Sequence, residues 1–480
     1  MSATLLNIYH RLPGWMRSGA VSLHGFHLRS WRFGPETPRL IEEALERDHW
    51  TQLQWQDWRQ KRLAYVLHRA ATRVPYYREY WAERRRRGDA SSWEDFENWP
   101  ILEKETLRSR PRAFVADDCE TRRMFHGHTS GTTGSPIDLW RSRTTMRTLY
   151  ALSTARTRGW HGVRQGDRWA KLGGQVVTPG RQQKPPFWVW NGALKQLYMS
   201  SYHLAPHLIE HYLDALVAHR IDYLFGYTSS VFALAQEMVR LKRNDIKLKV
   251  VITEAEPLFE HQRRVITNAF QCPVRETYGM GEVVTAASEC ASGTLHQWPE
   301  IGHVEVLGET GPVSDGELGE LVCTSLLNGD MPLIRYRVGD RGRLTTHASC
   351  ECNRTLPQID IVEAGSYDLL ITDDGRRILG LEDVFFNLPI RQAQIVQERL
   401  DLIRARYVPE PGFTAESARS IVKAVQARMK GVRVILEPVA EIPRAANGKF
   451  WLQVCKVPEV EIQSLLNASR GIAPATDRAR

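Results

Sequence analysis

Residues 128–136 read His-Thr-Ser-Gly-Thr-Thr-Gly-Ser-Pro. Glycine lets backbone N–H groups turn toward a ligand, hydroxyl groups add donors, and Pro136 stops regular structure. The stretch therefore predicts a loop that wraps an anion, with polyphosphate as the expected ligand. No Lys-Ser or Lys-Thr follows at P-loop spacing, which disfavours a P-loop kinase or GTPase. An ordinary exposed turn is the alternative, because Ser, Thr and Gly also dominate turns.

Four more segments follow in a fixed order. They are 254–257 (EAEP), 278–282 (YGMGE), 336–340 (YRVGD) and 443–450 (PRAANGKF). In this order the five segments resemble the core motifs of the adenylate-forming superfamily of acyl-CoA synthetases, luciferases and peptide-synthetase adenylation domains. The segments 74–78 (VPYYR) and 374–378 (DGRRI) are typical of its phenylacetate-CoA ligase and CapK-like branch. The resemblance covers nearly the whole chain.

At 480 residues the chain is too long for one compact core. The resemblance implies an α/β fold, with a large N-terminal adenylate-forming domain of mixed sheets and a small mobile C-terminal α/β lid domain. We expect residues 1–120 to form the helical N-terminal part of the large domain, 121–366 its α/β nucleotide- and acyl-binding core, and 369–480 the lid. In the core, strands alternate with amphipathic helices, which predicts a mostly parallel sheet with ligands at the carboxyl ends of its strands.

Activation of a carboxylate by ATP needs phosphate donors, a carboxylate for Mg²⁺ and a mobile cation at the α-phosphate. The resemblance gives Glu282 the Mg²⁺ and Lys449 the catalytic step at the α-phosphate. It places the phosphate loop at Thr129, Ser130, Gly131, Thr132, Thr133 and Gly134. It places the adenine frame at Glu254, Ala255, Glu256 and Tyr278, and the ribose acceptor at Asp340.

Each of these residues also has an ordinary structural interpretation. Glu282 and Lys449 can be solvated surface charges, and Asp340 can be a turn residue after a glycine. Lys449 follows Gly448 in a turn that can present a compact three-donor ammonium to a phosphate. The joint occurrence of the motifs in order favours the functional interpretation.

The region that binds the acyl group is the least readable part of the sequence. The family binds its carboxylate near Lys171, Gly173, Gly174, Gln175, Tyr202, His203, Phe225, Gly226 and Tyr227. Aromatic residues before a glycine are equally ordinary in packing, so the identity of the acid stays open.

One departure from the family concerns the hinge between the domains. The family usually carries Gly-Arg there, with the arginine near the ribose and phosphates, whereas this chain aligns Ala364-Gly365. Arg337, Arg341 or Arg343 can substitute. The missing arginine keeps a nucleotide-binding pseudoenzyme open as an alternative.

Three thiols and one imidazole form a candidate zinc site: Cys290, His296, Cys350 and Cys352. Cys₃His sets bind Zn²⁺ tetrahedrally, although this spacing is not a standard one. Related ligases carry similar Cys/His sets near these positions that hold zinc. We therefore expect a structural Zn²⁺ site closed to substrate.

The resulting functional hypothesis is an AMP-forming ligase that uses ATP, Mg²⁺ and CoA. A carboxylic acid becomes an acyl-adenylate, and the acyl group passes to a thiol such as CoA. In the alternative hypothesis the enzyme also forms the acyl-adenylate, but it passes the acyl group to a hydroxyl or amine of a glycan in capsule or exopolysaccharide biosynthesis.

Charge and composition narrow the class of protein. The net charge is +9, from 64 basic and 55 acidic side chains, and no segment resembles a nucleic-acid-binding module. Seven cysteines without a secretory signal favour reduced thiols in a cytoplasmic protein, and no apolar run suits a transmembrane helix. The first 34 residues mix aromatic and aliphatic side chains with Arg and His, so they suit either peripheral membrane contact or an arm docked on the protein's own surface.

Overall fold

The chain folds into two compact units, seen here in a computed structural model. The first comprises residues 1–338 and 342–361, and the second residues 339–341 and 362–480. The structure describes residues 8–129, 137–175, 177–179, 182, 184–204, 206–363, 370–373, 377–378, 381–385, 388–429, 431–443, 451, 453–458, 460–462 and 464–465.

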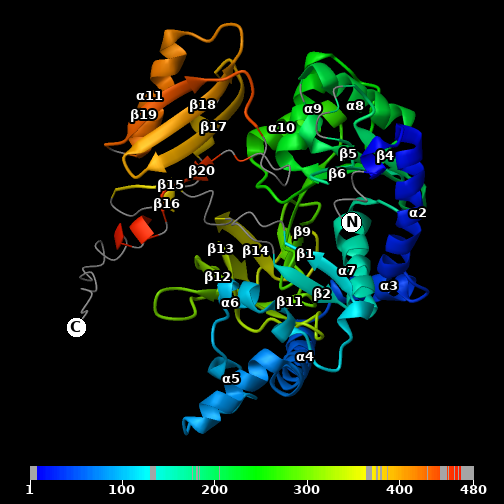
Figure 1. The fold of residues 1–480 in the computed structure, drawn as a ribbon, viewed down its shortest axis with the longest axis vertical. Coiled ribbons are helices and arrows are strands. Elements are labelled where there is room, and N and C mark those ends of the chain that lie inside the picture. The colour runs from blue at the N-terminus through cyan, green and yellow to red at the C-terminus, as the bar shows by residue number, and fades with distance from the viewer. Residues whose placement is uncertain are drawn as a thin grey trace. The chain divides into compact units, whose positions relative to one another are not determined.

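Figure 1 labels the α-helices α2 to α10 of the first unit. They are α2 (Gly14–Arg32), α3 (Thr37–Arg47), α4 (Gln52–Arg73), α5 (Pro75–Arg86), α6 (Lys104–Ser109), α7 (Arg143–Ser153), α8 (Pro206–Ala218), α9 (Thr228–Arg240) and α10 (Glu260–Phe270). Prolines begin helices here: Pro75 opens α5 and Pro38 lies in the first turn of α3, where a missing N–H costs nothing.

The strands of this unit form a hairpin and one large sheet. The hairpin pairs β1 (Phe125–His128) with β2 (Asp138–Arg141). The sheet has the order β11-β12-β13-β14-β10-β9-β8-β7-β6-β3-β5-β4. Its strands are β3 (Trp169–Gly173), β4 (Trp188–Asn191), β5 (Gln196–Ser200), β6 (Tyr223–Tyr227), β7 (Val250–Glu254), β8 (Val274–Gly279), β9 (Ala286–Glu289), β10 (Leu295–Gln297), β11 (Gly302–Leu307), β12 (Gly319–Ser325), β13 (Tyr336–Thr345) and β14 (Gln358–Glu363).

The structure confirms the predicted α/β class with a mixed sheet, but the expectation of a mostly parallel sheet is wrong. In this sheet β5, β3, β6, β7 and β8 pair in parallel, whereas β4 pairs antiparallel with β5. Helices α8, α9 and α10 connect these strands, as parallel crossovers require. After β8 no α-helix intervenes, and β9, β10, β11 and β12 pair antiparallel.

The crossover helices bury one face against the parallel strands. Tyr212 of α8, Leu234 of α9 and Ile266 of α10 lie in one core with Leu172 of β3 and Val251 of β7. All five side chains are less than 1% exposed. This core holds β6, β7 and β8 in place, and the motifs at 254–257 and 278–282 lie at the carboxyl ends of β7 and β8.

The second unit is a four-stranded sheet with one covering helix. Its order is β19-β18-β17-β20, and Ile421 and Val425 of the helix share a core with Ile395 and Ile403 of the strands. The elements are β15 (Leu370–Ile371), β16 (Arg377–Ile378), β17 (Ile390–Arg399), β18 (Leu402–Pro409), α11 (Ala415–Arg428), β19 (Arg433–Pro438) and β20 (Gln453–Cys455). Among the helices described in either unit, none is long and apolar enough to cross a membrane.

Candidate functional site

The predicted phosphate loop lies between β1 and β2 in the sequence. Thr129 N donates to Ile137 O at 3.0 Å, and Ile137 N donates to Thr129 Oγ1 at 3.0 Å. These two bonds fix the start and the end of the loop. Thr129 is described, whereas the other loop residues predicted from the sequence lie outside the described residues: Ser130, Gly131, Thr132, Thr133 and Gly134.

Glu282 lies in the turn that follows β8 and is only 6% exposed. Tyr336 Oη donates to Glu282 Oε1 at 2.9 Å, and Lys104 Nζ lies 3.9 Å from the same oxygen. Arg141 donates to the carbonyl of the preceding Gly281. The carboxylate is thus buried and oriented by a hydroxyl hydrogen bond, as carboxylates that bind metals commonly are.

The turn that carries Glu282 packs against the base of the phosphate loop. A Cβ added to Gly281 would lie 3.5 Å from Thr129 Cγ2 and 3.8 Å from Leu139 Cδ1. Val283 adopts a φ of +55°, a strained conformation for a β-branched residue, and Val283 N donates to Met280 O at 3.1 Å. Strained backbone of this kind gathers at functional sites, where packing holds it.

The Glu254–Glu256 segment turns sharply after β7, since Ala255 adopts a φ of +63°. Glu254 forms an ion pair with Lys171, whose Nζ also lies 4.2 Å above the Phe225 ring. Glu256 accepts from Ser229 N at 2.7 Å and from Ser229 Oγ at 3.1 Å, at the start of α9. The Glu256 carboxylate therefore binds the N-terminal turn of α9.

Glu276 is a carboxyl group that the sequence analysis missed. It precedes Tyr278 by two residues in β8, so the two side chains leave the strand on one face. Leu258 N donates to Glu276 Oε1 at 3.3 Å. Burial and the neighbouring Glu289 carboxylate raise the pKa of Glu276 to about 7. The signal in the sequence was a carboxyl group within the strand that leads to the motif at 278–282.

Replacement of Glu276 by glutamine is expected to stabilise the protein only at higher pH. The raised pKa means that the folded state holds the proton more tightly than the unfolded chain does. The wild-type protein therefore loses stability as pH rises from 4.5 to about 7, and above this range the loss is complete. We expect the variant to gain on the order of 2 kcal/mol over wild type across this window. Calorimetry at both ends of this pH window tests the prediction, with replacement of the exposed Glu46 by glutamine as the control. A difference in stability between variant and wild type that does not depend on pH would contradict it.

The four candidate zinc ligands come from three places in the chain. Cys290 follows β9, His296 lies in β10, and Cys350 and Cys352 precede β14. Their donor atoms all lie within 4.8 Å of one another. Cys290 Sγ lies 3.7 Å from Cys350 Sγ, and Cys352 Sγ lies 3.3 Å from His296 Nε2. His296 Nδ1 lies 3.1 Å from Leu356 O, so a proton on Nδ1 leaves Nε2 free for a metal.

The thiols of this cluster differ in how readily they ionise. Burial disfavours the Cys290 thiolate, but hydrogen bonds from the backbone of Thr294 and Ser292 outweigh it and lower the pKa. The pKa of Cys350 is lowered too, because a hydrogen bond from Thr294 helps to outweigh burial, while burial raises the pKa of Cys352 to about 11. The donor set and its spacing fit a tetrahedral cation.

Several predicted residues are not brought to this site by the described structure. Asp340 lies in β13, in the segment 339–341 that groups with the second unit. Lys449 and the hinge residues 364–368 lie outside the described residues. Two of the possible substitutes for the hinge arginine are already paired, Arg337 with Glu103 and Glu320 and Arg343 with Asp360.

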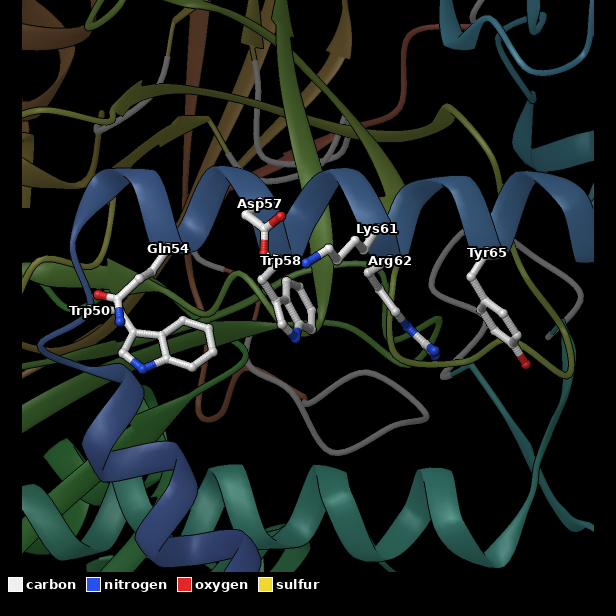
Figure 2. A pocket seen from close by; sticks show the side chains of 7 residues that line it. All are labelled: Trp50, Gln54, Asp57, Trp58, Lys61, Arg62 and Tyr65. Atoms are coloured by element: carbon white, nitrogen blue, oxygen red, sulfur yellow. Dashed lines mark hydrogen bonds and ion pairs between the residues drawn. The ribbon is translucent and has the colours of Figure 1, made fainter.

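One cavity of about 510 Å³ lies on the first unit along one face of α4. Figure 2 shows its lining, which contains none of the motif residues: Trp50, Gln54, Asp57, Trp58, Lys61, Arg62 and Tyr65. Lys61 pairs with Asp57 at 2.7 Å, and Arg62 donates to Leu326 O at 2.6 Å. The charges of this groove are thus satisfied within the protein, and it is not the site of the motifs.

Comparisons with known proteins agree with the geometry. Residues 370–455 match the CapK C-terminal domain. The chain is 31% identical to protein CapK of Staphylococcus aureus over 184 residues, which span 38% of this chain and 39% of that one. It is 30% identical to the phenylacetate-coenzyme A ligase of Pseudomonas putida over 325 residues, which span 65% of this chain and 70% of that one.

A solved structure shares the fold. It is 2-hydroxyisobutyryl-CoA ligase in the postadenylation state, with a TM-score of 0.64 at 20% identity, covering 86% of this chain and 91% of that one. The ordered motifs, the buried Glu282 beside the loop base and the long alignment to the Pseudomonas putida ligase lead to one conclusion. The chain belongs to the phenylacetate-CoA ligase family of adenylate-forming enzymes, and its second unit carries a CapK-type C-terminal domain.

Proposed function

We propose that the protein is an AMP-forming ligase that activates a carboxylic acid with ATP and transfers the acyl group to a thiol such as CoA. The observation that carries this proposal is the buried Glu282, fixed by Tyr336 on a strained turn that packs against the loop base at Thr129. Polyphosphate held by that loop would lie beside an oriented carboxylate. Bound Mg²⁺ would neutralise charge on the departing pyrophosphate.

In this proposal each of the motif residues has a defined role. The loop that starts at Thr129 binds the β- and γ-phosphates with backbone and hydroxyl donors. The backbone around Ala255 and the ring of Tyr278 hold the adenine, and Asp340 accepts from the ribose hydroxyls. Lys449 bridges the attacking carboxylate and the α-phosphate while negative charge moves onto pyrophosphate.

ATP–pyrophosphate exchange with a panel of aliphatic and aromatic acids tests the first half-reaction without knowledge of the acceptor. We expect at least one acid to give exchange. If ATP binds but no acid gives exchange, the nucleotide-binding pseudoenzyme suggested by the missing hinge arginine replaces this proposal. If exchange occurs but CoA does not accept the acyl group, the match to CapK favours acylation of a glycan hydroxyl or amine.

Replacement of Glu282 by glutamine is expected to lower the exchange rate by about 10²-fold, because the amide keeps the hydrogen bond from Tyr336 but loses the charge that holds Mg²⁺. Added Mg²⁺ should restore part of the rate, since the defect is in metal affinity. The matched control is Tyr336→Phe, which leaves the charge and loosens its orientation, and should cost roughly tenfold. An unchanged rate in Glu282→Gln would return this residue to a structural role.

The second unit is proposed to act as a lid. One closed position presents Lys449 to the α-phosphate, and a second one opens the adenylate to the acyl acceptor. Two chemistries at one adenylate require two arrangements of the lid, and a short hinge absorbs the change of backbone angles.

We also propose that Cys290, His296, Cys350 and Cys352 hold one structural Zn²⁺, which would cross-link the 290s to the 350s. Metal analysis of the purified protein should give about one zinc per chain. Cys350→Ser should lower both the zinc content and the melting temperature while ATP still binds. Cys119→Ser, a thiol outside this cluster, should keep the metal, and a zinc-free but equally stable wild type would contradict the site.

A further inference from the structure

Helix α2 packs on the rest of the first unit through Ser18, Ser22 and Gly25, and also through the buried Trp31 and the partly buried Val21. Ser18 Oγ accepts from Trp190 N at 3.1 Å, and Ser22 Oγ accepts from Gly192 N at 2.9 Å. Gly25 is required by close approach, because a Cβ there would lie 2.1 Å from Asn191 Oδ1. These partners belong to β4, the edge strand of the large sheet, and to the turn after it, and Figure 1 shows α2 running beside β4.

The opposite face of α2 is apolar and open to solvent. Trp15 is 77% exposed, Leu23 75%, Phe26 61% and Met16 39%. At about 100° per residue these four side chains fall within an arc of roughly 100°, so they form one stripe. Ile8, just before the helix, is 56% exposed as well. The helix also buries Trp31, yet it leaves these four large apolar side chains in solvent, whereas a surface helix of a globular protein usually turns its apolar stripe toward the core.

The charge around this stripe has one sign. The first acidic residue of the chain is Glu36, so residues 1–35 contain no Asp or Glu but four arginines. Arg11, which precedes α2, and Arg29, in the last turn of α2, are both exposed. An apolar stripe with an exposed Trp and with basic residues, but without any acid, is complementary to anionic lipid headgroups above an acyl region.

We propose that the exposed face of α2 docks on the surface of an anionic lipid bilayer. Trp15, Leu23 and Phe26 enter the boundary between headgroups and acyl chains, while Arg11 and Arg29 contact the lipid phosphates. A protein partner is less well matched, because nothing acidic on this helix would select its orientation. The proposal rests on residues 8–32, which include α2, and is independent of the proposed ligase activity.

Flotation of the full chain with vesicles tests the proposal. We expect binding to vesicles of phosphatidylcholine with about one third phosphatidylglycerol, weaker binding to phosphatidylcholine alone, and loss of binding as salt rises well above about 0.1 M. The triple variant Trp15→Ser/Leu23→Ser/Phe26→Ser should bind at least about tenfold more weakly. Its melting temperature should match wild type, because the three side chains are exposed.

Leu23→Ser and Leu53→Ser form a matched pair, since both leucines are 75% exposed on helices of the same unit. Only Leu23→Ser should weaken vesicle binding, and Arg11→Gln/Arg29→Gln should remove the preference for phosphatidylglycerol. Equal loss in both leucine variants, or no vesicle binding by wild type, would overturn the proposal. Sedimentation velocity that shows a dimer abolished by Leu23→Ser, without vesicle binding, would assign the face to a second copy of this chain instead.

Discussion

Replacement of Lys449 by alanine is expected to lower ATP–pyrophosphate exchange by about 10²- to 10³-fold, while ATP affinity stays within a few fold. In its proposed role the lysine acts on charge that develops only at the transition state, so its loss should affect the rate rather than binding of the ground state. Lys456→Ala is the control, because Lys456 is an exposed lysine of the same unit. An equal effect of the two variants would show that the loss is a general one of positive charge.

The same variant separates the two half-reactions. If the second unit rotates, Lys449 has left the adenylate when the acceptor arrives, so Lys449→Ala supplied with a synthetic acyl-adenylate should transfer the acyl group to CoA at a nearly normal rate. Asp340→Ala should behave differently and weaken ATP binding itself, since a ribose contact exists in the ground state too. Equal losses in both half-reactions of Lys449→Ala would argue against a lid with two positions.

Replacement of Arg156 by methionine is expected to destabilise the first unit by about 3–5 kcal/mol, because it leaves two buried carboxylates short of a partner. Arg156 is fully buried in the π-helical turn after α7. It donates to Asp48 at 2.8 Å and to Glu300 at 2.6 and 2.9 Å. Burial disfavours its charge, but the two carboxylates outweigh burial and raise its pKa.

Thermal unfolding measures this effect, with Arg87→Met as the matched control. Arg87 pairs with Glu83 at 2.8 Å, but its side chain is 76% exposed, so the same substitution should cost at most about 1 kcal/mol. The pKa of Glu300 is lowered because Arg156 outweighs its burial. This part of the stability is therefore present above pH 4.5 and is lost as pH falls through the lowered pKa. A similar melting temperature for both variants would show that the network does not hold this region together.

Local chemistry determined much of this protein from the sequence alone. The pattern of residues 258–270 and that of residues 415–430 each predict a helix, and the structure has helices at Glu260–Phe270 and Ala415–Arg428. Helices follow from periodic apolar residues, and tight loops follow from glycine and hydroxyl residues at fixed places, so both are visible in a linear chain. The order of the motifs likewise identified the family before any contact was known.

Tertiary structure decided what lies far apart in the chain. The hydroxyl of Tyr336 binds Glu282, which lies 54 residues away in the sequence. Cys290 and Cys350 are in contact although 60 residues separate them. Glu256 looks like a ligand residue in the sequence, but its carboxylate holds the start of α9. Long-range pairings of this kind depend on strand register and packing, which residue types at short spacing do not encode. For the same reason the sequence left both membrane contact and docking on the protein's own surface open for the first 34 residues. The structure shows that α2 contacts β4 through Ser18 and leaves Trp15 and Leu23 exposed.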